Sequence, residues 1–454
     1  MVLAFSLPFS RRLPAFPVPL LNYQNLVLLA ALIAYGTHRE ESGSRRGRAY
    51  HAILITGFSF FVTLSFIKTV TTFQPDRFWR FWDPYENMLN YKALITCLAL
   101  YVLASKAVTS REDLIAVFKA GVAGIVVESA YTAFEYVVLR PGRVTGHMAE
   151  PNMVGSFLAC SFAFCLALVL ILPRTDIFWK LGAAAMVLAP VALLGTLSRG
   201  SYAAAALGFL VVTTLLDKRM LVVGVAIVAL YPLWIPAKVS HRFSETLQNE
   251  ESQSWKFRDG KAAEGSALIA MIDEKLDEGA SSGELDSGET RLDSSVQTRL
   301  VVWEAAVKMM RDHPLGIGYG VFPWYMQYYS TIVKWKASHN IYLRVGAESG
   351  IAALGLFLIL LALFLRGAFR IGTTRDDVLL KALGLGFFGY MITLGFNALS
   401  VDIFFQVDVN GQFWVFVGAL LQAPLLPRAV ADIPRVEEAR ATPQGATPLY
   451  ELVR

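Results

Sequence analysis

Long apolar segments, separated by polar connections, run along nearly the whole chain. Each is close to the length that an α-helix needs to cross a hydrocarbon core of about 30 Å. We place eleven of them at 20–36, 50–67, 88–105, 113–133, 152–172, 177–196, 201–216, 219–235, 340–365, 379–399 and 411–426. The pattern therefore predicts an all-α polytopic membrane protein with 11–12 transmembrane helices.

Basic residues of the short connections set the predicted orientation. They fall in alternate connections, at Arg39, Arg45, Arg46, Arg48; Lys106, Arg111; Arg174, Lys180; Lys218, Arg219; and Arg366, Arg370, Arg375, Lys381. Because cytoplasmic loops carry an excess of Lys and Arg, these connections are predicted to face the cytoplasm. Arg11 and Arg12 fit this topology only if a break near the N-terminus makes a twelfth helix.

Four regions follow from this topology. Residues 1–235 hold the N-terminal transmembrane helices, 236–338 form a large external loop, and 339–427 hold the C-terminal helices. Residues 428–454 are predicted to be a disordered cytoplasmic tail. The loop begins acidic and rich in Gly and Ser, with a short helix at about 262–276, and then becomes amphipathic over 297–313. This second part predicts a helix lying across the membrane mouth.

Composition supports the same class. Hydrophobic residues make up 55% of the chain and charged residues 17%, and the mean hydropathy of +0.48 exceeds that of a soluble domain. The net charge of +5 is explained by the basic loops, so we expect no nucleic-acid partner. The three cysteines lie within apolar segments and the six histidines show no paired ligand spacing, so we expect no disulfide, metal or cofactor.

Three basic residues stand at external ends of apolar segments. Arg199 lies in a short junction, Arg299 opens the amphipathic helix, and His339 opens the 340–365 segment. Two guanidiniums can bind a pyrophosphate, and a histidine can accept a proton near neutrality. These residue types are what a transferase with a diphosphate-activated donor needs. Gly350 follows His339 by about three helical turns, which predicts that the two share one helix face.

Several motifs together resemble the O-antigen ligase and polymerase superfamily. They are Ser198-Arg199-Gly200-Ser201, Arg299 with Trp303, His313-Pro314-Leu315-Gly316-Ile317-Gly318, Ser338-His339-Asn340 with Gly350, and Gly146 to Asn152 with its Pro151-Asn152 helix start. The resemblance implies an all-helical membrane fold in the bacterial inner membrane, with an active site facing the periplasm or cell exterior. It also implies glycan transfer from an undecaprenyl-pyrophosphate carrier to a lipid A-core or other sugar acceptor, without a metal.

Residue roles are carried over from this resemblance. The family's loop histidine matches His339, and its two key arginines match Arg199 and Arg299. The arginines would neutralise the leaving pyrophosphate, and His339 would deprotonate or orient the acceptor hydroxyl in an inverting single displacement. We assign substrate contacts to Arg143, His147, Asn152, Asn340 and Tyr319.

Each assignment has a simpler structural alternative. A lone arginine at a helix end commonly reaches lipid phosphates, and His339 with Asn340 could cap a helix. Solvated loop charges would equally explain Arg143 and His147. Arg344 and Glu348 are four residues apart and are predicted to pair. Two external carboxylates, Asp402 and Asp408, are the alternative to His339 as the acceptor base.

Four functions remain open at this stage. A ligase transfers a finished glycan, a polymerase extends a growing chain, and an O-linked oligosaccharyltransferase modifies a protein; all three use the same donor. A lipid-linked glycan transporter is the fourth. Transporters usually show repeat halves and broken helices at corresponding positions, and we find no convincing internal repeat. The conspicuous polar residues are external, which favours an enzyme working at one membrane face.

Overall fold

The computed structural model describes residues 1–8, 25, 28–30, 49–72, 83–148, 150–229, 294–331, 333, 336–374 and 376–426. Over these residues the fold is helical and contains no strand. Predictions for Arg11 and Arg12, for the 20–36 segment, for most of the external loop's first part and for the tail lie outside the described residues. The predicted all-α polytopic class is confirmed.

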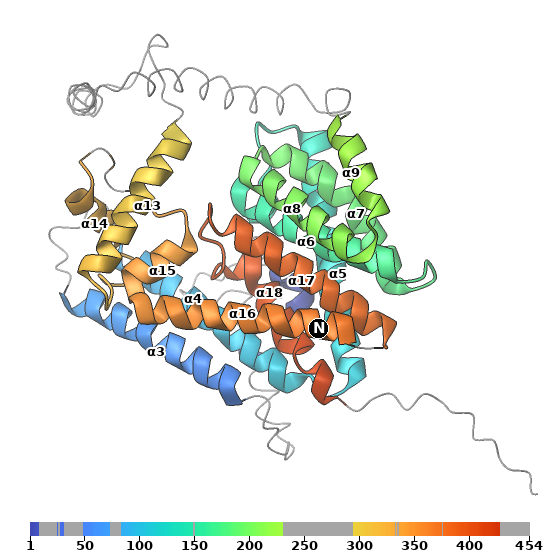
Figure 1. The fold of residues 1–454 in the computed structure, drawn as a ribbon, viewed down its shortest axis with the longest axis horizontal. Helices are drawn as coiled ribbons and strands as arrows, with labels where there is room; N and C mark the ends of the chain where they lie inside the picture. The colour runs from blue at the N-terminus through green and yellow to red at the C-terminus, as the bar shows by residue number, and fades with distance from the viewer. Residues whose placement is uncertain are drawn as a thin grey trace, which may run out of the picture.

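The helices follow one another along the chain with short connections. Their bounds are α1 Val2–Ser6, α3 Ala49–Thr72, α4 Pro84–Ala107, α5 Arg111–Phe134, the π-helix η4 Glu135–Leu139, α6 Pro151–Ile171, α7 Ile177–Thr196, α8 Arg199–Leu216, α9 Arg219–Ala229, α13 Ser294–Asp312, α14 Phe322–Tyr329, α15 Ile341–Ser349, α16 Ile351–Thr374, α17 Val378–Asn397, α18 Val407–Leu420 and the 3₁₀ turn η5 Ala423–Leu425. Figure 1 shows α13, α14 and α15 gathered on one side of the molecule and α6 to α9 on the other, with α16, α17 and α18 between them.

Within the described residues, eight helices are long and apolar enough to cross a membrane: α3 to α8, α16 and α17. Seven of them coincide with predicted spans. Of the remaining predicted spans, 219–235 is described only to Ala229, and 411–426 corresponds to α18, whose 14 residues are all buried. At 1.5 Å per residue α18 extends about 21 Å, less than the hydrocarbon core.

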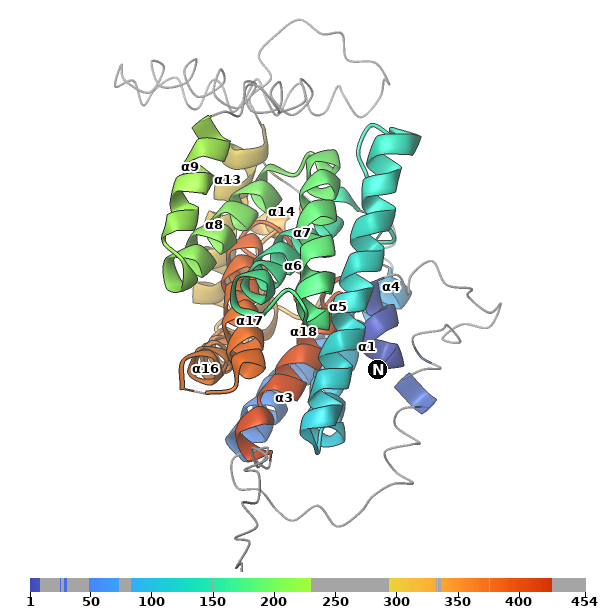
Figure 2. The same cartoon turned by 90° about the vertical axis from the view of Figure 1, so that its right-hand side faces the viewer.

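Small residues let the central helices approach closely. The helices α6 and α17 pack side by side, and α7 lies between α5 and α6 (Figure 2). A Cβ at Gly386 of α17 would lie 2.9 Å from the Phe164 carbonyl oxygen of α6, and one at Gly208 of α8 would lie 2.8 Å from the Ala163 Cβ. Such close packing of small residues is how membrane helices associate without a hydrophobic driving force between them.

The predicted continuous span over 340–365 is wrong. Gly350 ends α15 with φ of 93°, and α16 starts afresh at Ile351, whose N–H donates to the Pro314 carbonyl at 3.0 Å. A Cβ at Gly350 would lie 2.8 Å from that carbonyl oxygen. His339 and Gly350 therefore do not share a helix face. They bracket a nine-residue helix, and that length accounts for their spacing.

Candidate functional site

Arg199 begins α8 at a tight junction with α7. Leu197 ends α7 in the left-handed conformation with φ of 51°, and the buried Ser198 and Ser201 hydroxyls lie 2.9 Å apart across the first turn of α8. A Cβ at Gly200 would lie 2.9 Å from Ser400 Oγ, so this turn packs against the connection between α17 and α18. The Ser-Arg-Gly-Ser motif thus fixes the position of Arg199 with small residues on both sides of it.

Arg299, one of the two matched arginines, lies half-buried in α13, one helical turn before Trp303. Burial lowers the pKa of Arg299, and the nearby positive charge of Arg199 lowers it further. Two guanidiniums from separate helices therefore meet at one place. Two close cations repel each other unless an anion binds between them, so the pair is suited to a multiply charged anion such as a diphosphate.

His339 precedes α15 in a strained conformation. Its φ is 47°, a region that costs a non-glycine residue on the order of 1–3 kcal/mol, and its side chain is exposed. Asn340 is buried and its Oδ1 accepts from the N–H groups of Tyr342 at 3.1 Å and Leu343 at 3.2 Å. Asn340 is therefore the N-cap of α15, and it holds His339 outside the helix.

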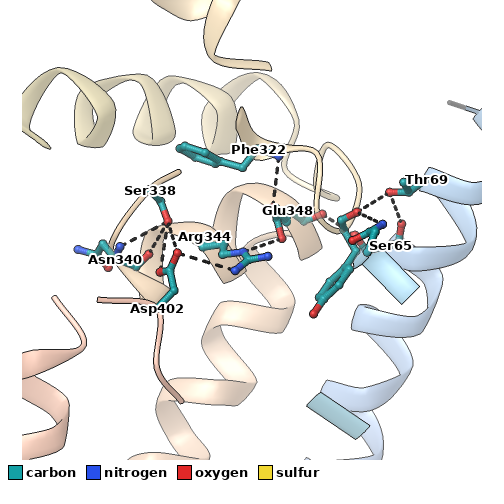
Figure 3. A network of polar contacts seen from close by, with 10 residues as sticks. Ser65, Thr69, Phe322, Ser338, Asn340, Arg344, Glu348 and Asp402 are labelled. Carbon is teal, nitrogen blue, oxygen red and sulfur yellow. Dashed lines mark hydrogen bonds and ion pairs between the residues drawn. The ribbon is translucent and has the colours of Figure 1, made fainter. Parts of the chain in front are cut away.

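Asp402 lies beside His339. Ser338 Oγ donates to both Asp402 carboxylate oxygens at 3.4 Å, and Arg344 Nη1 lies 3.8 Å from Asp402 Oδ2 (Figure 3). Burial raises the pKa of Asp402, while the positive charges of Arg344 and His339 act in the opposite direction. The structure thus brings a carboxylate to the matched histidine from a different part of the chain.

The predicted pair of Arg344 and Glu348 is present. Arg344 Nε lies 3.2 Å from Glu348 Oε2, and the same guanidinium lies 5.9 Å from the Tyr319 ring centroid. Arg344 also reaches Asp402, so it bridges two carboxylates within one network (Figure 3). The pair borders a cavity of about 250 Å³, whose lining includes Asp83, Glu86, Asn87, Asn90, Phe322 and Ser338. Carboxylates, amides and a hydroxyl are groups that can bind sugar hydroxyls.

Tyr319 anchors the glycine-rich loop between α13 and α14. Its side chain is buried, and its carbonyl accepts from Thr69 Oγ1 at 3.0 Å and Asn87 Nδ2 at 3.1 Å. The neighbouring Gly318, with φ of 125°, donates its N–H to the Glu348 carbonyl at 3.1 Å. The loop therefore binds α3 and α4 on one side and the end of α15 on the other.

Arg143, His147 and Asn152 brace the junction that carries Arg199. Arg143 Nε donates to the Thr196 carbonyl at 2.8 Å, and its Nη2 donates to Asn152 Oδ1 at 3.2 Å. His147 Nδ1 lies 2.7 Å from Oε2 of the fully buried Glu128. These contacts tie the loop after η4 to α5 and α7, so the three residues support the site through their packing.

Sequence reasoning missed the role of two glutamates in α5 and η4. Glu128 accepts from the His147 N–H at 3.0 Å, and Glu135 accepts from the Gly146 N–H at 2.8 Å. The two carboxylates are seven residues apart in an apolar run, a spacing that puts both on one helix face. That spacing was the available signal.

One connection joins the two halves of the site. It runs between α17 and α18; its Ser400 meets Gly200 beside Arg199, and its Asp402 meets Ser338 beside His339. The Ala398 carbonyl also accepts from the Ile341 N–H at 3.2 Å. The candidate site therefore consists of the α8 and α15 starts around this connection, with Arg299 approaching Arg199 from α13.

Within the part of the chain that the structure describes, no group of three or more His, Cys, Asp and Glu side chains is placed to hold a metal ion. Cys97, Cys160 and Cys165 are buried and free. We therefore assign no metal ligands to these residues.

Residues 184–358 match the sequence model of the family described as O-antigen ligase. The matched range includes Arg199, Arg299 and His339, and it confirms the resemblance to the O-antigen ligase and polymerase superfamily. The match indicates a ligase-like or polymerase-like function, that of a glycosyltransferase-like membrane enzyme acting on a lipid-linked glycan and a sugar acceptor. No curated protein matches the chain.

Proposed function

We propose that this protein transfers a glycan from an undecaprenyl-pyrophosphate carrier to a sugar acceptor at the external face of the bacterial inner membrane. The observation that carries the proposal is the approach of Arg199 and Arg299, two cations from separate helices, beside the connection that also holds Asp402 next to His339. One group of residues suits a diphosphate and the other suits a hydroxyl, as such a transfer requires.

The arginine pair acts on the donor. Both guanidiniums bind diphosphate oxygens, and they stabilise the negative charge that grows as the bond from the anomeric carbon to the diphosphate oxygen breaks. The carrier leaves as undecaprenyl pyrophosphate. A guanidinium stays charged at physiological pH and binds phosphate oxygens in a bidentate manner, which lysine does not.

His339 acts on the acceptor. It takes the proton of the acceptor hydroxyl as that oxygen forms its bond to the anomeric carbon, and the ionised Asp402 stabilises the resulting imidazolium. Attack from the face opposite the leaving diphosphate inverts the anomeric configuration. The left-handed backbone at His339 supports this role, because strain at an exposed residue with a simple glycine alternative points to function. Asp402 as the base itself is the alternative arrangement.

The external location rests on the charges at the opposite end of the helices. Arg366 and Arg370 lie near the end of α16, and Lys106 lies at the end of α4, whereas the candidate site adjoins the start of both helices. Cytoplasmic ends carry the excess of Lys and Arg, so the site is assigned to the other membrane face.

Transfer by the wild-type protein in proteoliposomes tests the function. The donor is undecaprenyl-pyrophosphate oligosaccharide, supplied with lipid A-core or with no added acceptor. Glycan on lipid A-core identifies a ligase, and longer carrier-linked chains identify a polymerase. Movement of intact donor across the bilayer without a new glycosidic bond would contradict the proposal and favour transport.

A further inference from the structure

A second cavity, of about 610 Å³, lies at the other end of the helices that frame the candidate site. It is bordered by the start of α3, the ends of α4 and α16, and the segment after α18. In α3, Ser65 contacts the Glu348 carbonyl near the site, and from position 65 back to position 51 the helix rises about 21 Å. The cavity is therefore separate from the site.

The charge of this cavity has one sign. Lys106, Arg366 and Arg370 line it, and its lining contains no Asp or Glu. Arg366 and Arg370 are four residues apart in α16, so they lie on the same helix face. Among the residues that the structure describes, neither of them forms an ion pair with a carboxylate, whereas Arg111 at the same end of the bundle binds Asp377 at 2.9 Å.

The remaining lining is largely apolar. Ile55, Val102, Leu363, Ile371 and Leu421 contribute side chains from α3, α4, α16 and the turn after α18. Gln422 is only 3% exposed, and its Oε1 has no hydrogen-bond partner in the described part of the chain. The cavity thus presents cations and an acceptor together with an apolar wall.

We infer that this cavity binds the headgroup of an anionic membrane phospholipid. The phosphate is placed by Arg366, Arg370 and Lys106, and the upper acyl chain lies against the apolar wall. Basic pockets between membrane helices at the cytoplasmic side recognise such headgroups. A soluble phosphate would use the cations and leave the apolar wall empty, so the combination favours a lipid. The inference is independent of the proposed transferase activity.

Lipid binding to the purified full-length protein in detergent tests this inference. The thermal unfolding midpoint is titrated with phosphatidylglycerol, with phosphatidylcholine of the same acyl chains, and with glycerol phosphate. The test variant is Arg366→Gln with Arg370→Gln. The matched control is Lys180→Gln with Lys381→Gln, which removes the same charge from exposed lysines outside the cavity lining.

Phosphatidylglycerol should raise the unfolding midpoint of the wild type and of the control at lower concentration than phosphatidylcholine does. Each lost arginine should weaken phosphatidylglycerol binding about 5-fold, so the double variant should bind about 25-fold more weakly. Equal responses to the two lipids would overturn the inference, as would a response to glycerol phosphate as strong as to the lipid. Equal weakening in test variant and control would also overturn it. A double variant that does not fold is replaced by Arg370→Gln alone, for which the 5-fold effect is expected.

Discussion

The positive charge of Arg199, at the first turn of α8, lowers the pKa of Arg299 in α13. The two residues are one hundred positions apart, and both guanidiniums belong to motifs that match the same family range. A fold gains nothing from placing two cations together. The arrangement therefore points to an anionic ligand that the pair binds.

Arg299→Gln should separate activity from stability. The transfer rate should fall about 10²- to 10³-fold, the loss that follows removal of one donor from a preorganised anion site. The unfolding midpoint should stay the same or rise, because a half-buried charge and its repulsion by Arg199 are both removed. Arg311→Gln is the control, since Arg311 lies exposed on the same helix. A stability loss that parallels the activity loss would indicate a structural role for Arg299.

His339→Gly and His339→Ala should differ in stability but not in activity. Both remove the imidazole, so transfer should fall about 10²- to 10⁴-fold for each, as for the loss of a general base. Glycine adopts φ of 47° without strain, so the glycine variant should unfold at a higher temperature than the alanine variant. Thermal unfolding and transfer rates measured on the same preparations check both parts. Substantial activity in either variant would show that another group takes the proton.

Asp402→Asn should change the pH dependence of transfer. Burial raises the pKa of Asp402, so its ionised form is lost as the pH falls through that raised value. If His339 and Asp402 must both be unprotonated, the logarithm of the wild-type rate should rise with a limiting acidic slope of about two, and that of Asp402→Asn with a slope of about one. At neutral pH the variant should be about 10- to 100-fold slower, because a hydrogen bond or ion contact to a charged group contributes about 1.5–3 kcal/mol. Identical profiles would exclude Asp402 from the reaction.

Gly350→Ala should destabilise the protein, and Gly355→Ala should not. Gly350 has φ of 93°, and a Cβ there would lie 2.8 Å from the Pro314 carbonyl oxygen, so the substitution should cost about 1–3 kcal/mol or more. A Cβ at Gly355 in α16 meets nothing within 4 Å. Thermal unfolding of the two variants measures the difference. Equal midpoints would show that α15 and α16 can join into one continuous helix.

Hydropathy was sufficient to predict α3 to α8 and α17, because each span is a single apolar run with polar ends. It failed at α15 and α16, because the run over 340–365 is continuous in sequence and the break depends on Gly350 meeting Pro314 in space. Pairing of Arg344 with Glu348 was predictable, since a helix brings positions four apart together.

The site was predictable only in part. Arg199, Arg299 and His339 came from motifs and family resemblance, and the structure shows Arg199 and Arg299 close to each other. The place of Asp402 beside His339 depends on how the connection after α17 folds, and no local pattern encodes it. Arg143 and His147 were interpreted as substrate contacts because loop charges look available in a sequence. Their partners, Thr196 and Glu128, lie on other helices.

The most direct test of the proposed mechanism is glycan transfer in proteoliposomes by Arg199→Ala and His339→Ala, with Arg140→Gln as an exposed control at the same end of the bundle. Release of undecaprenyl pyrophosphate and formation of the new glycosidic bond are measured together on folded protein. We expect the wild type and the control to release carrier and form product in equal amounts, and both site variants to do neither. Normal transfer by either site variant would contradict the assigned site.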